Sequence, residues 1–204
     1  MNHKVSNVQQ LYVSATELYN NIVVGGDASA DTIIRNLVDA IENLKQNWKG
    51  IDAGLKIQEL IKVHNEMIVV RNALAQLAHD SSQVAANYRE IQNTNGASLE
   101  PLSALSFDTK NVLGDYSDTA DTIDINPTAE IGKQHIDAAN GDIDSFINQT
   151  SQKYQEIMDN WTAGTGRDSA QGAFDSFVAN AKKYKETLAD VSYNVSAALQ
   201  NYSF

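Results

Sequence analysis

The sequence contains no cysteine, and it has only two prolines and two tryptophans among its 204 residues. The absence of cysteine excludes disulfide bonds, thiolate chemistry and the common cysteine-based zinc sites. Both prolines, Pro101 and Pro127, lie away from the periodic stretches. Because proline is scarce while Ala, Leu, Gln, Lys and Asn are abundant, we predict a mostly helical protein.

Positive charge is also scarce. Lys and Arg number 15 against 26 Asp and Glu, which gives a net charge of −11. A polyanion would be repelled by such a chain, so nucleic acid is not an expected partner. The segment 96–126 is the most one-sided, with one lysine against six acidic residues. We interpret the acidic surface mainly as an aid to solubility.

Long apolar runs are absent as well. No stretch approaches the ~18 apolar residues of a membrane-spanning helix, and the most apolar run is only Met67–Val70. Stable membrane insertion is therefore not expected. Residues 1–6 are not followed by the apolar region of a signal peptide. We expect a chain that is made in the cytoplasm and that, if secreted, leaves without a Sec signal.

The longest periodic stretch follows Trp48. Apolar residues recur there at alternating spacings of three and four, with Ser81 as the one polar member. The apolar members are Leu60, Val63, Met67, Val70, Leu74, Leu77, Val84, Tyr88 and Ile91. A heptad pattern of this length predicts one long helix, from Ile51 to Asn93, with a coiled-coil-like face. At ~1.5 Å per residue this helix is about 65 Å long.

Three further regions repeat this spacing. The region after Trp161 contains Phe174, Phe177, Ala181, Tyr184, Leu188, Val191, Val195, Ala198 and Tyr202. The region before Trp161 contains Ile136, Ala139, Ile143, Phe146, Ile147, Tyr154 and Ile157, and Asn126-Pro127 marks its predicted start. The region before Trp48 contains Val8, Leu11, Ala15, Leu18 and Ile22, then Ile34, Leu37, Ile41 and Leu44. Gly25-Gly26 separates these two pieces, so we predict that the first helix is kinked or briefly broken there.

Four amphipathic arms predict an all-α fold of two long helical hairpins, packed as an antiparallel four-helix bundle. The first hairpin spans residues 1–95, an acidic linker spans 96–126, and the second hairpin spans 127–204. Returning along a ~65 Å helix takes roughly 20 extended residues at ~3.3 Å each, which the linker can supply. This length favours the two Trp turns at opposite ends of the bundle. We also expect the linker to dock on the bundle through its apolar residues, which are Leu99, Leu102, Leu105, Phe107, Leu113 and Tyr116.

Both tryptophans occur in similar short sequence motifs. The first reads Asn47-Trp48-Lys49-Gly50, and the second reads Asn160-Trp161-Thr162-Ala163-Gly164. A helix, a Trp-x-Gly turn and a second amphipathic helix resemble the WXG-motif family of type VII (ESX-like) secretion systems. The first sequence matches the Trp-x-Gly motif in full, and the second has one extra residue between its tryptophan and its glycine. The turn residues are then Trp48, Gly50, Trp161 and Gly164, and the resemblance covers everything but the linker.

The resemblance implies a fused pair, in which one chain does what two WXG subunits normally do. Such a protein is non-enzymatic and serves secretion as substrate, adaptor or chaperone, with the secretion machinery or a cognate toxin as its partner. Many family members carry a C-terminal Tyr-x-x-x-Asp/Glu export signal. Here Tyr184 is followed four residues later by Leu188 and Tyr193 by Ala197, so the signal is absent and an adaptor role gains weight.

The C-terminal end is the predicted partner-binding surface. If the Trp turns lie at opposite ends, the last residues of the chain lie beside the Trp48 turn. The residues expected there are Tyr193, Leu199 and Tyr202. The chain would be a monomer that forms an intramolecular pseudo-dimer, or a domain-swapped dimer that exchanges hairpins across the linker.

Residue patterns for catalysis or metal binding are weak. The histidines, His3, His64, His79 and His135, show no ligand spacing among themselves. The run Gly164–Arg167 lacks the Lys-Ser/Thr of a phosphate loop. Asp115, Asp118, Asp121 and Asp124 recur every third residue but lack the glycine and the pattern of a calcium loop. We therefore predict no catalytic residue, no cofactor and no metal ligand.

A second class of function remains open from the sequence. The soluble component of a helical-bundle pore-forming toxin can also be a bundle of long helices. That class needs an apolar hairpin for insertion, and the short run Met67–Val70 is the nearest feature here.

Overall fold

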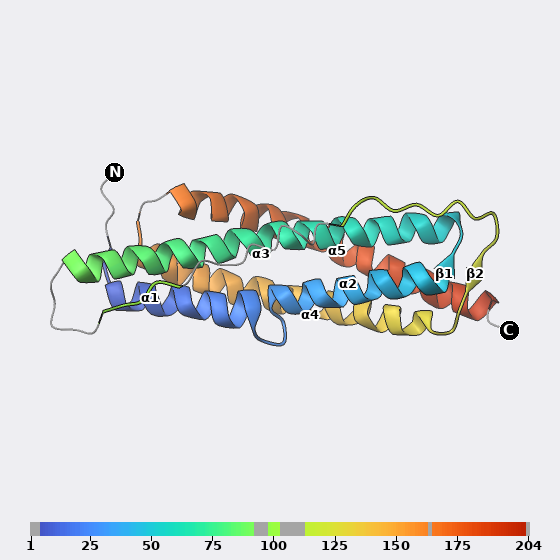
Figure 1. Cartoon of the computed structure of the whole chain (residues 1–204), viewed down its shortest axis with the longest axis horizontal. Helices are drawn as coiled ribbons and strands as arrows, with labels where there is room; N and C mark the ends of the chain where they lie inside the picture. The colour runs from blue at the N-terminus through green and yellow to red at the C-terminus, as the bar shows by residue number, and fades with distance from the viewer. Residues whose placement is uncertain (1–4, 92–97, 103–112, 163–164, 203–204) are drawn as a thin grey trace.

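The computed structural model describes residues 5–91, 98–102, 113–162 and 165–202 (Figure 1). These residues are predominantly helical, which confirms the all-α prediction. The helices are α1 (Val8–Glu17), the π-helix η1 (Leu18–Val24), α2 (Ala30–Asn47), α3 (Ile51–Ile91), α4 (Ala129–Asn160) and α5 (Thr165–Tyr202). Two short strands, β1 (Trp48–Lys49) and β2 (Asp124–Ile125), pair antiparallel to each other.

The helices lie lengthwise beside one another and form an elongated bundle (Figure 1). Helix α2 packs along α3 and α4, and α5 packs along α3 and α4. At one end of the bundle α2 ends and α3 begins, whereas α4 ends and α5 begins at the other end (Figure 1). One continuous cluster of buried apolar side chains draws on both halves of the chain.

The heptad positions supply much of this core. On α3, Leu60, Met67 and Leu74 are fully buried, and the polar heptad member Ser81 is buried with them. Phe146 of α4 meets Phe177 of α5 edge to face, with ring centroids 5.7 Å apart. The heptad pattern fails to predict burial at the end of α3. Ile91, its last predicted member on α3, is 79% exposed and is the last residue of this helix that the structure describes.

The paired glycines separate two helices. Helix η1 ends at Val24, and α2 begins at Ala30 with the Ser29 hydroxyl accepting the Thr32 N–H at 3.2 Å. Gly26 adopts φ +109°, which favours glycine, and a Cβ at Gly25 would lie 2.6 Å from the Asn20 carbonyl oxygen. The backbone between the two helices therefore forms a short break.

Helix α4 begins later than Asn126-Pro127 suggested. Thr128 is the residue before its first turn, and Thr128 makes no side-chain capping hydrogen bond. The Asn126 side chain instead accepts the Thr128 N–H at 2.9 Å, and the Asn126 carbonyl accepts the Ala129 N–H at 2.9 Å. The asparagine thus closes a turn that leads into the helix.

The described residues between α3 and α4 lie against α3. The Leu102 N–H donates to the Ser82 hydroxyl at 3.0 Å. Further along, both backbone groups of Leu113 bond to the Asn65 side chain, at 2.9 and 3.0 Å. The described apolar residues pack partly on the core, as expected: Leu99, Leu102, Leu113 and Tyr116. The other two that were expected to dock, Leu105 and Phe107, lie outside the described residues.

Asp118 anchors this linker where α3 begins. Its carboxylate accepts the N–H groups of Ala120 at 3.0 Å and of Gly50 at 3.2 Å. These two hydrogen bonds hold the pKa of Asp118 below its ordinary value. The linker backbone also passes close to α3, because a Cβ built on Gly54 would lie 2.5 Å from the Asp118 nitrogen.

Replacing Gly54 by alanine should displace the linker. Alanine normally stabilises a helix relative to glycine by about 0.5–1 kcal/mol. At Gly54 the added methyl group meets backbone, so we expect a net loss of about 1–3 kcal/mol in the free energy of unfolding. Gly141→Ala is the matched control, since nothing lies within 4 Å of its Cβ position. Urea titration of both variants tests this, and equal stabilisation by both would refute the close approach.

Candidate functional site

The first Trp turn is closed by a segment from the other half of the chain. Trp48 is 3% exposed, and its N–H donates to the Leu44 carbonyl at the end of α2. In the strand pair, Trp48 lies opposite Ile125. The Asn126 N–H, one residue further on, donates to the Asn47 carbonyl at 2.8 Å.

The second Trp turn is closed in the same way, by the N-terminal segment. Trp161 is also 3% exposed, and its N–H donates to the Ile157 carbonyl at 2.8 Å. It forms an antiparallel bridge with Val5. The Ser6 N–H donates to the Asn160 carbonyl at 3.1 Å.

The tryptophans of the two turns share one backbone conformation. Trp48 has φ −136° and ψ 122°, and Trp161 has φ −135° and ψ 106°. The asparagine before each tryptophan donates its side-chain N–H to the carbonyl four residues back, at 2.9 Å for Asn47 and 2.8 Å for Asn160. Each half of the chain therefore ends its first arm identically and closes the turn of the other half.

Sequence reasoning missed the closing segments. Val5 and Ile125 each precede an asparagine that leads into the first arm of a half, Asn7 and Asn126. The Asn7 side chain caps α1 by accepting the Gln10 N–H at 3.0 Å. The only sequence feature that marks these segments is one apolar residue ahead of each asparagine. A single residue does not predict a strand, so the pairing with the Trp turn could not be read from the sequence.

The glycine prediction applies to the first turn. Gly50 has φ +118°, and a Cβ there would lie 3.3 Å from the Thr122 carbonyl oxygen. Glycine is thus required both by the backbone conformation and by the close approach of the linker. Gly164, named as the turn residue of the second copy, lies outside the described residues.

The last helix passes beside the first Trp turn. Trp48, Asp52, Asn194, Ala198 and Asn201 line one small hollow of about 170 Å³ between α3 and α5. The three residues singled out at this end differ in exposure. Tyr193 is 71% exposed, Leu199 packs partly on the core, and Tyr202 is the last residue of α5, with its side chain outside the described part.

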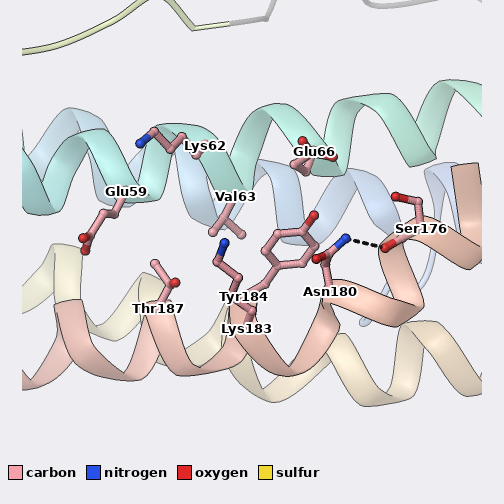
Figure 2. A pocket seen from close by; sticks show the side chains of 9 residues that line it. All are labelled: Glu59, Lys62, Val63, Glu66, Ser176, Asn180, Lys183, Tyr184 and Thr187. Atoms are coloured by element: carbon pink, nitrogen blue, oxygen red, sulfur yellow. Dashed lines mark hydrogen bonds between the residues drawn. The ribbon is translucent and has the colours of Figure 1, made fainter.

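A larger hollow lies further along the same pair of helices (Figure 2). It has a volume of about 460 Å³, and Lys183 reaches from α5 into the space between the helices (Figure 2). Burial raises the pKa of the Tyr184 phenol, and the neighbouring Glu66 carboxylate raises it further. The Asn180 side chain donates to the Ser176 carbonyl at 2.9 Å.

The described histidines take part in packing and in holding the linker. His64 is fully buried, with Nδ1 3.0 Å from the Asn65 side-chain oxygen, and His79 Nδ1 lies 2.9 Å from the Leu102 carbonyl. His135 Nδ1 lies 3.2 Å from the Asn36 side-chain oxygen. In the part of the chain that the structure describes, no group of three or more His, Asp or Glu could hold a metal ion.

The described helices also include none that is both long and apolar enough to cross a membrane. The chain matches no protein-family model, no curated protein and no solved structure. The geometry of the two turns and of the α3–α5 face is therefore what bears on function.

Loss of the Ser6 N–H should loosen the second turn. Ser6→Pro removes the donor to the Asn160 carbonyl, whereas Ser6→Ala keeps it and loses only the hydroxyl contacts. We expect Ser6→Pro to be less stable than Ser6→Ala by about 1 kcal/mol. In a Trp48→Phe background, Trp161 fluorescence should also be quenched more readily in the proline variant. Equal quenching of the two variants would contradict the closing role of this segment.

His64 should make stability depend on pH. Burial lowers its pKa below the ordinary value of 6.5, so the folded chain holds it neutral. Below pH 6.5 the unfolded chain binds a proton that the folded chain does not. The stabilisation present above that pH is then lost as the pH falls. The free energy of unfolding, measured from pH 8 to 5, should fall less steeply for His64→Gln than for the wild type, and parallel curves would exclude this effect.

Proposed function

We propose that this chain is a non-enzymatic interaction protein, a fused pair of WXG-like hairpins that serves type VII secretion. Its two hairpins would form an antiparallel four-helix bundle whose first arm is interrupted at Gly25-Gly26. One polypeptide would then replace the two subunits that normally pair. Of the three roles open to such a protein, adaptor or chaperone is favoured over direct substrate because neither Tyr184 nor Tyr193 is followed by an acidic residue at the fourth position.

The equivalence of the two Asn-Trp turns carries this proposal. Trp48 and Trp161 share backbone conformation, burial and the hydrogen bond of the preceding asparagine. Each turn is closed by the segment that leads into the opposite hairpin. A duplicated unit whose copies close each other's ends supports descent from a pair of separate hairpins, which is how WXG proteins assemble.

The C-terminal end supports the location of the partner surface. The last turns of α5 lie beside the intact Trp-x-Gly turn, and Tyr193 of the same helix is 71% exposed. An exposed tyrosine can provide a large contact area at a small cost in conformational entropy. The proposed partner is a component of the secretion machinery or a toxin that the chain accompanies.

Secretion assays separate this role from that of a pore-forming component. In cells that make the chain, deleting the membrane ATPase of the type VII system should abolish export of the chain or of the toxin bound to it. The purified protein should not release dye from liposomes, because none of the described helices is apolar enough to span a bilayer. Export that is independent of the ATPase, together with dye release by the pure protein, would reverse the assignment.

A further inference from the structure

One groove follows the boundary between α3 and α5. It consists of three adjoining hollows, with volumes of about 460, 390 and 170 Å³. The first two share Glu59 and Lys62, and the last two share Asp52 and Asn194. On α3 the groove extends from Asp52 to Glu66, which is about 21 Å at ~1.5 Å per residue. That is the length of a helix of about four turns.

Apolar side chains border this groove. Leu55 is 60% exposed on its α3 side, and Ile123 of the linker is 43% exposed near the Trp48 turn. Val63 and Tyr184 contribute to its lining between the helices (Figure 2). An apolar border of this kind gives an amphipathic helix something to cover, and two packed helices offer ridges between which a third can lie.

The charge of the groove differs from that of the whole chain. Its lining holds four lysines, Lys49, Lys56, Lys62 and Lys183, and three acidic residues, Asp52, Glu59 and Glu66. Lys56 is neutralised by Glu59 at 3.0 Å and by Asp190 at 2.6 Å. Lys62 and Lys183 are exposed and form no ion pair with any residue that the structure describes. A protein of net charge −11 thus keeps two available ammonium groups on one groove.

We propose that this groove binds an acidic amphipathic helix of a partner protein. The apolar face of that helix would cover Leu55 and Tyr184, and its flanking carboxylates would pair with Lys62 and Lys183. A small anion would use the two ammonium groups but would leave Leu55 and the rest of the groove uncovered. The inference rests on the proposed interaction role, and it specifies the shape and the charge of the partner.

A designed helix tests the charge requirement on the intact chain. The probe is a fluorescein-labelled peptide of 18 residues with a leucine stripe flanked by glutamates, and a second peptide carries lysines in place of the glutamates. Fluorescence anisotropy should show binding of the acidic peptide only. The double variant Lys62→Glu, Lys183→Glu should weaken binding about tenfold, which is roughly 1.4 kcal/mol, because it replaces two attractive charge pairs with two repulsive ones.

Lys182 provides the matched control. It neighbours Lys183 on α5, its side chain is 89% exposed, and it is not among the groove residues. Lys182→Glu should therefore change the affinity less than twofold. Leu55→Ser, at an exposed position, should weaken binding without unfolding the chain, as circular dichroism can verify. Equal losses of peptide affinity for Lys182→Glu and for the double variant would refute binding of the peptide in the groove.

Two further outcomes would overturn the proposal. One is failure of the acidic peptide to bind the wild-type chain. The other is displacement of the bound peptide by millimolar inorganic phosphate as effectively as by unlabelled peptide, which would indicate a small-anion site. The proposed function fails separately. Dye release from liposomes, with peptide binding intact, would contradict the secretion role but not the helix-binding groove. ATPase-dependent export without peptide binding would contradict only the helix-binding groove.

Discussion

The architecture depends on a reciprocal backbone interaction. The N–H of Asn126 reaches the carbonyl of Asn47, and the N–H of Ser6 reaches the carbonyl of Asn160. Each bond satisfies a carbonyl at a helix end, where the helix itself offers no donor. Because donor and acceptor belong to opposite halves, neither Trp turn is complete within its own half. The same contacts hold each first arm in register with the other hairpin.

The linker completes this arrangement through polar side chains on α3. The Asn65 amide bonds both backbone groups of Leu113, and the Gln58 amide accepts the Tyr116 N–H at 2.6 Å. Extended backbone that runs along a helix cannot pair with the helix backbone, whose groups are already bonded. Amide side chains supply the missing donors and acceptors. Asparagine and glutamine on α3 thus hold Leu113 and Tyr116 of the linker against the helix.

Much of the fold could be read from periodicity. The heptads after Trp48 and Trp161 located α3 and α5, because burying an apolar stripe is a local requirement of each helix. The sequence pattern predicted the ends of the helices less well. Ile91 continues the heptad but is exposed, and Asn126 closes a turn rather than capping α4. Helix ends depend on what packs beyond them, which a periodic pattern does not record.

The sequence by itself determined the helices, the position of both Trp turns and the need for glycine at position 50. These features follow from side-chain spacing and from backbone sterics, which act within a few residues. Only the tertiary structure decided that Val5 closes the Trp161 turn and that three hollows join into one groove between α3 and α5. Those contacts join residues more than a hundred positions apart. Such contacts exist because the two halves pack against each other.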